Sequence, residues 1–199
     1  MKMRRIFIPA LLSASLAFPV FAGLAEGVTA YKSGDYKMAY AEFLPLAEQG
    51  DANVQHNLGM MYSTGKGVAR DYKEAFKWYR RAAEQGQSKS QYSLGNMYFL
   101  GYGISQSNEE ALKWFRKAVG QNEHHAKHRL GQMYEKGVGV PKNYVKAYMW
   151  FSLAVSGGVR KSIRYRNFLK DLMTPEQIAD ARKLISEWSS SDPVTASTL

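Results

Sequence analysis

The sequence contains no cysteine. Disulfide bonds, thiolate metal sites, a cysteine nucleophile and a lipid anchor on an N-terminal cysteine are therefore excluded. Beyond the first 22 residues, no segment approaches the roughly 20 apolar residues that a membrane-spanning helix needs. The remaining chain is long enough for one domain with a real core, and side-chain packing alone must hold it together.

The N-terminal segment has the order of a secretory signal peptide. A basic start precedes an apolar run over 6–18, and Val20 and Ala22 then stand at positions that suit a cleavage site. We expect residues 1–22 to be removed before Gly23 and the protein to be exported, periplasmic in a Gram-negative cell, with secretion as the alternative. An uncleaved anchor is disfavoured because about 13 apolar residues interrupted by a proline are short for a bilayer.

Positive charge exceeds negative charge along the chain. There are 27 Lys and Arg against 17 Asp and Glu, a net charge of +10. Three of the positive charges lie in the signal segment, so the mature chain would carry about +7. Such an excess favours an acidic partner or peripheral association with an anionic envelope surface. The charges are scattered instead of forming a block, and export argues against nucleic acid as a partner.

Three consecutive blocks of 36 residues align without a gap: 51–86, 87–122 and 123–158. Leucine, glycine, methionine and tyrosine recur in the first half of each block, and alanine and tryptophan recur in the second half. The recurring residues include Leu58/Leu94/Leu130, Gly59/Gly95/Gly131, Met61/Met97/Met133, Gly65/Gly101/Gly137, Ala75/Ala111/Ala147 and Trp78/Trp114/Trp150. This period indicates a solenoid of stacked units.

Each block predicts two helices joined by a glycine-rich turn. Apolar residues at i, i+4, i+7 and i+8 give the first helix one buried stripe. The turn glycines suit the left-handed conformation of a helix C-cap. Asp71, Ser107 and Asn143 are suitable N-caps for the second helices. We expect the recurring tryptophans and methionines to be core, and the glycine after each leucine to permit close helix packing.

The two ends depart from the repeat. Residues 23–50 match a shortened unit and predict an N-terminal cap. Residues 159–188 predict two capping helices, the first basic and the second opened by Thr174 and Pro175 with Gln177 completing a capping box. Residues 189–199, rich in Ser, Thr and Pro, predict a disordered tail.

The string LGxMYxxGxGV, followed by a polar cap and an alanine- and tryptophan-containing helix, resembles the Sel-one-like repeat, a relative of the tetratricopeptide repeat. The resemblance covers residues 51–158 closely and 23–50 as a truncated unit. It implies an all-α, right-handed α/α superhelical solenoid whose members act as adaptors or scaffolds for other proteins, without a catalytic site. The second block departs from the pattern by lacking the usual acidic cap and by ending in Asn122 instead of glycine.

The candidate partner-binding surface is the face of each first helix opposite its apolar stripe. We expect it to line the concave side of the superhelix and to hold a protein or peptide through hydrogen bonds and ion pairs. The alternative is that these are ordinary solvated positions. The residues are Asn53, His56, Asn57, Met60, Lys89, Tyr92, Ser93, Asn96, His125, His128, Arg129 and Gln132.

Other chemistry has little support in the sequence. His124, His125 and His128 have helical spacing, but Glu123 is the one nearby carboxylate that could complete a zinc site with them. The glycine-rich turns lack the form of a phosphate-binding loop, and no serine lies in a nucleophile elbow. We expect no enzyme activity, no cofactor and no metal. The leading hypothesis is a protein-binding adaptor of the envelope; the alternatives are a secreted factor that engages a host protein and an accessory protein that binds peptidoglycan or another glycan.

Overall fold

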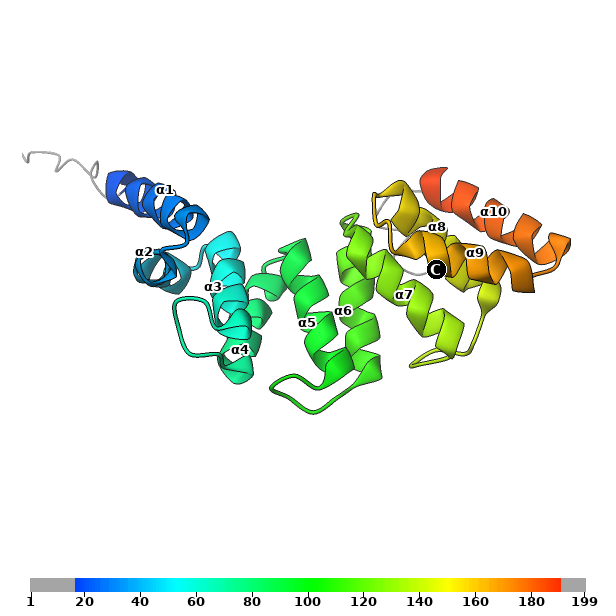
Figure 1. Ribbon diagram of the computed structural model, residues 1–199, viewed down its shortest axis with the longest axis horizontal. Helices are drawn as coiled ribbons and strands as arrows, with labels where there is room; N and C mark the ends of the chain where they lie inside the picture. The colour runs from blue at the N-terminus through cyan, green and yellow to red at the C-terminus, as the bar shows by residue number, and fades with distance from the viewer. Residues whose placement is uncertain (1–16, 191–199) are drawn as a thin grey trace, which may run out of the picture.

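The computed structural model describes residues 17–190, which form ten α-helices and no strand. Figure 1 shows these helices laid out one after another in a curved, elongated array. The predicted all-α solenoid is therefore confirmed. The helices are α1 (Ala17–Ser33), α2 (Tyr36–Glu48), α3 (Ala52–Thr64), α4 (Tyr72–Glu84), α5 (Ser88–Leu100), α6 (Asn108–Gly120), α7 (His124–Lys136), α8 (Tyr144–Ser156), α9 (Ser162–Leu172) and α10 (Pro175–Ser190).

The helices form antiparallel pairs that coincide with the repeats. Helix α3 packs on α4, α5 on α6 and α7 on α8, and α1 and α2 form the shortened unit before them. The second helix of each unit also packs on the first helix of the next unit. Each unit thus completes its core with its neighbours, as expected of a repeat that cannot bury its apolar face alone.

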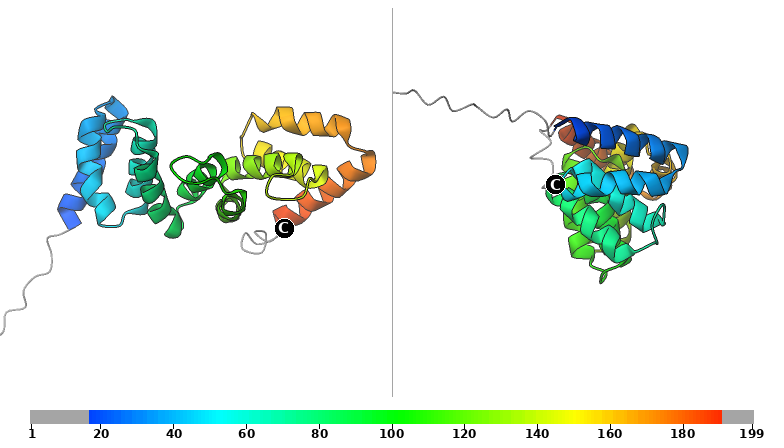
Figure 2. Two further views of the ribbon diagram at one scale, coloured as in Figure 1. Left: turned by 90° about the horizontal axis from the view of Figure 1, so that it is seen from below. Right: turned by 90° about the vertical axis from the view of Figure 1, so that its left-hand side faces the viewer.

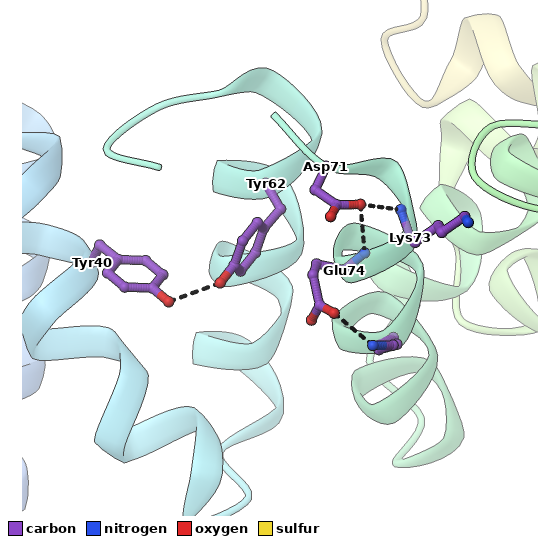
Figure 3. A network of polar contacts seen from close by, with 6 residues as sticks. Tyr40, Tyr62, Asp71, Lys73 and Glu74 are labelled. Atoms are coloured by element: carbon purple, nitrogen blue, oxygen red, sulfur yellow. Dashed lines mark hydrogen bonds and ion pairs between the residues drawn. The ribbon is translucent and has the colours of Figure 1, made fainter. Parts of the chain in front are cut away.

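The predicted helix ends are present. The side chains of Asp71, Ser107 and Asn143 each accept a hydrogen bond from a backbone amide in the first turn of α4, α6 and α8. Figure 3 shows the Asp71 carboxylate between the amides of Lys73 and Glu74, at 2.8 and 3.2 Å. The first helices end at glycines in the left-handed conformation, with φ of 74°, 72° and 71° at Gly65, Gly101 and Gly137.

The glycine in the middle of each first helix marks the closest approach to the second helix. A Cβ added to Gly95 would lie 2.6 Å from a ring carbon of Phe115, well inside van der Waals contact. Gly59 and Gly131 meet the rings of Tyr79 and Phe151 in the same way. The aromatic ring therefore occupies the space that a side chain would need. This close contact explains why glycine recurs here, although glycine inside a helix costs about 1 kcal/mol relative to alanine.

The recurring large residues are core, as predicted. Trp78, Trp114 and Trp150 are 7%, 7% and 3% exposed. Met61, Met97 and Met133 are buried as well. These positions lie in four core clusters, some of which join residues of neighbouring units.

Helix α1 begins at Ala17 and continues through the predicted cleavage position. Most of the predicted signal segment, residues 1–16, lies outside the described residues, and its removal stays a prediction. The terminal unit is joined to the first full repeat by a hydrogen bond of 2.8 Å between the hydroxyls of Tyr40 and Tyr62 (Figure 3).

The C-terminal helices diverge. Both α9 and α10 pack on α8, and Figure 2 shows them on different sides of the α7–α8 pair. The Trp188 ring meets the Trp150 ring edge-on at 4.9 Å. The capping box predicted at Thr174 and Gln177 is present, with bonds of 3.0 and 3.3 Å.

Helix α10 extends to Ser190, so the start predicted for the disordered tail is wrong by two residues. The helix continues because its last turn still buries Trp188 against the core. The rest of the predicted tail, 191–199, lies outside the described residues. Between residues 17 and 190, no helix combines the length and apolar character needed to cross a bilayer.

Candidate functional site

Side-chain contacts between successive first helices recur at the same repeat position. His56 of α3 lies 2.8 Å from the hydroxyl of Ser90 in α5, measured from Nδ1. One pair of units later, His128 of α7 makes the same 2.8 Å contact with Ser162 of α9. Both serines are fully buried. These histidine–serine pairs therefore connect first helix to first helix across the unit boundary.

Burial keeps both histidines neutral at pH 7. Loss of solvent, with a smaller contribution from Lys89, lowers the pKa of His56 to about 4. Loss of solvent, followed by repulsion from Lys161, Arg129 and His125, lowers the pKa of His128 to about 4. An uncharged imidazole forms the hydrogen bond between its Nδ1 and the serine hydroxyl without placing a charge in the protein interior.

His128 is 2% exposed, which corrects its placement on the candidate surface. Its ring contacts those of Phe151 and Tyr165, at centroid distances of 5.5 and 5.3 Å, and these two rings stack on each other at 5.1 Å. A helix inside a two-layer array has neighbours on three sides, and position 128 faces the next first helix. The side chain therefore contributes to packing and is closed to a partner.

The remaining predicted residues are exposed or partly exposed on the first helices. Asn53, Lys89 and His125 share one repeat position at the start of these helices and are exposed. The Tyr92 and His125 rings lie 5.8 Å apart and join α5 to α7 along this surface. The partly exposed members are His56, Asn57, Met60, Tyr92, Ser93, Asn96, Arg129 and Gln132.

A polar network continues this surface from α7 to α9. Arg129 donates from Nη1 to Gln132 Oε1 at 3.0 Å, and Gln132 donates to the Tyr165 hydroxyl at 3.5 Å. The Arg129 guanidinium also lies 5.7 Å from the centre of the Phe99 ring on α5. Phe99 and Tyr165 were not predicted, because neither residue recurs at its repeat position. Together these contacts fix the direction of the Arg129 side chain.

A second polar feature lies beneath the surface and was also missed. Gln55 is buried and donates to the carbonyl of Ala47 in the preceding unit at 2.9 Å, while Gln85 donates to the Gln55 side-chain oxygen at 2.8 Å. The next unit repeats both bonds, from Gln91 to Ala83 at 3.2 Å and from Gln121 to Gln91 at 2.9 Å. Gln55 and Gln91 occupy the same repeat position. This recurrence was the sequence signal that would have revealed these glutamine hydrogen bonds between units, which we call the glutamine seam.

The third unit replaces this seam with a different set of residues. Lys127 stands where the glutamines were and donates to the Asn122 side chain at 3.0 Å. Burial lowers the pKa of Lys127. Asn122 has a positive φ of 61°, the conformation of the glycine that it replaces. The His124 ring covers Gly157, where a Cβ would overlap it.

The three histidines of α7 therefore have different surroundings. His124 packs on Gly157, His125 is exposed and His128 is buried beside Ser162. In the range 17–190, no three side chains of His, Cys, Asp or Glu come together in a metal-binding group.

The outer faces of the second helices carry short-range ion pairs. Glu74 pairs with Lys77 on α4. Lys113 pairs with Glu110 on α6 at 3.5 Å. The i,i+3 geometry brings Glu110 onto the same side of α6 as Lys113. These pairs are solvent-exposed, and pairs of this kind contribute about 0–1 kcal/mol.

The three repeat units match a known protein family. The Sel1 repeat family model matches residues 52–87, 88–122 and 124–159. No curated protein matches the chain. Among solved structures, a Sel1 repeat protein from Oxalobacter formigenes is 34% identical with a TM-score of 0.70, covering 75% of this chain and 59% of that one.

A second similar structure is c5321, a protective antigen present in uropathogenic Escherichia coli strains that displays an SLR fold. It is 29% identical with a TM-score of 0.80, covering 90% of this chain and 39% of that one. This chain thus spans less than two thirds of either relative. Three matched units, stacked through the same glycines, caps and tryptophans, make this chain a member of the Sel1 repeat family.

Proposed function

We propose that this chain is a non-enzymatic adaptor of the bacterial envelope that binds a protein or peptide along the first-helix surface, the exposed face of α3, α5 and α7. Sel1 repeat proteins generally mediate protein–protein interactions, and their fold is typically a non-catalytic scaffold. The envelope location, the choice of face and the absence of catalysis are parts of the proposal.

The observation that carries the choice of face is the contact pattern between units. The histidine–serine pairs and the Tyr92–His125 ring contact all join first helices to first helices. In a curved array, the layer whose helices lie closer together is the inner one. These contacts therefore support a concave first-helix side, where several units can contact one extended partner.

The side chains on this surface suit a polypeptide ligand. Asn53 and Asn57 offer amide donors and acceptors, and Lys89 and Arg129 offer positive charge. The tryptophans of the repeat are buried, so none of the three offers a ring to a sugar. This distribution favours a peptide over a glycan.

Capture from native envelope by chemical crosslinking tests the proposal. The Lys89→Ala/Arg129→Ala variant removes the two cations of the first-helix surface, and Lys77→Ala/Lys113→Ala removes two exposed cations of the second helices as a matched control. We expect the first variant alone to lose the partner. Equal loss in both variants, or retention in both, would contradict the choice of face.

Fractionation tests the location separately. Retention in the periplasm would support the envelope adaptor. Release into the medium would favour the secreted alternative, for which the similarity to a protective antigen of uropathogenic strains is the supporting observation.

A further inference from the structure

Helix α9 is a first helix without a second helix of its own. Ser162 occupies in α9 the position of Ser90 in α5, and each serine hydroxyl forms a hydrogen bond with Nδ1 of the histidine of the preceding unit. In every complete unit a second helix follows and packs on the first. Helix α10 instead packs on α8, on another side of the array from α9 (Figure 2). One face of α9 is therefore left without a partner helix.

The side of α9 that continues the first-helix surface carries the most exposed large apolar residues of the described chain. Phe168 is 54% exposed and Leu172 is 53% exposed, one helical turn apart. By repeat register Phe168 corresponds to Asn96 and Gln132 of the first-helix surface, and Leu172 to the exposed Leu100. The apolar pair thus extends the first-helix surface onto α9.

The same segment is strongly basic. Residues 160–172 contain five cations and one acidic residue, Asp171. The ion pairs formed by residues 17–190 lie on α4, α6 and α10, and none includes this segment. The cations are Arg160, Lys161, Arg164, Arg166 and Lys170. An uncompensated patch of one sign attracts an oppositely charged partner.

We propose that the exposed face of α9 docks an acidic, amphipathic segment of the partner protein. This inference rests on the proposed function and specifies the chemistry of the partner. Lys161, Arg164, Phe168 and Leu172 follow one another along one side of α9 at spacings of three or four residues. Partner carboxylates meet the cations at one end of this line, and apolar side chains cover Phe168 and Leu172 at the other end.

The surroundings favour a protein segment over a lipid surface. A helix that lies in a membrane interface presents a wide apolar face. Here the apolar area is limited to Phe168 and Leu172, and the hydrogen-bonded pair of Gln132 and Tyr165 borders it. Asp171 precedes Leu172, Glu176 follows it by four residues and both are exposed, so they repel anionic headgroups. Hydrogen-bonding groups beside a short apolar strip suit a peptide.

Fluorescence anisotropy with defined peptides tests this proposal on the mature chain. The probe is a labelled helical peptide with Glu on one face and Leu and Phe at i, i+3 and i+4 spacing. Its controls are a scrambled sequence and a version with Lys in place of Glu. We expect binding of the acidic amphipathic peptide alone, weakened at least tenfold in Phe168→Ser/Leu172→Ser and at least tenfold in Lys161→Glu/Arg164→Glu.

A matched variant on the opposite flank of the same helix controls for a general loss of charge or apolar surface. Ile163→Ser/Lys170→Glu changes one exposed apolar residue and one exposed cation, and we expect less than a twofold effect. All of the substituted residues are exposed. Melting temperatures of the variants should therefore stay within a few degrees of the wild type.

Each other outcome overturns the proposal. No binding of the acidic peptide, or equal loss in the opposite-flank variant, removes α9 as the docking face. Binding to vesicles of phosphatidylglycerol and phosphatidylethanolamine that depends on Phe168 and Leu172, without peptide binding, assigns the face to the membrane. Concentration-dependent dimerisation abolished by Phe168→Ser/Leu172→Ser assigns it to a second copy. Envelope capture that still depends on Lys89 and Arg129 would preserve the adaptor function in all three cases.

Discussion

Acidification should destabilise the array through two particular histidines. His56 and His128 each have a pKa of about 4 in the folded chain, against an ordinary value of 6.5. A depressed folded pKa means that protonation favours the unfolded chain, so the stabilisation is fully present above pH 6.5 and is lost as the pH falls towards 4. Between pH 7 and pH 5 each histidine should withdraw about 2 kcal/mol, or about 4 kcal/mol for both.

Urea unfolding followed by circular dichroism at pH 7 and pH 5 measures this loss. The replacements His56→Gln and His128→Gln keep a polar side chain near the serine and do not titrate. Each should reduce the difference in unfolding free energy between the two pH values by about 2 kcal/mol, whatever its effect at pH 7. Tyr92 occupies the equivalent position between α5 and α7, so that boundary has no histidine–serine pair. A double variant with the same acid loss as the wild type would refute the assignment.

Three further predictions concern stability and are checked by the same denaturation at pH 7. Gly95→Ala should destabilise the chain by about 1–3 kcal/mol, because its Cβ overlaps the Phe115 ring, and Phe115→Leu in that background should recover part of the loss. Gln91→Leu should lower the free energy of unfolding by about 1–3 kcal/mol, because the Ala83 carbonyl and the Gln121 side-chain amide lose their partner. An unchanged free energy of unfolding would show that the glutamine seam does not stabilise the fold. Asp71→Ala should cost about 1 kcal/mol as a lost N-cap, while Asp71→Asn should be near neutral.

The regular part of the fold was predictable because each unit repeats the same physical solution. Glycines in the first helix, N-caps on the second helix and buried tryptophans recur at one period, so each occurrence supports the others. The packing of α10 was not predictable in this way, because the sequence after α9 no longer follows the period. Whether a closing helix packs on α8 or on α9 depends on tertiary contacts such as that between Trp150 and Trp188.

The candidate surface was predictable only in part. Opposition to the apolar stripe correctly selected Asn53, Lys89 and His125 as exposed residues. It also selected His128, because a helical wheel assumes one buried face and one open face. In the stacked array a third side of each first helix meets the next first helix, which leaves a narrower open face than the wheel suggests.

Site-specific photocrosslinking in native envelope tests whether the partner binds along the first-helix surface. A benzoylphenylalanine is placed at Asn96, on the first-helix surface, and in a separate variant at Lys113, whose side chain is 59% exposed on the second helix α6. We expect a covalent adduct with a partner protein from position 96 and none from position 113. An adduct from position 113 alone would place the partner on the second helices and rule out binding along the first-helix surface.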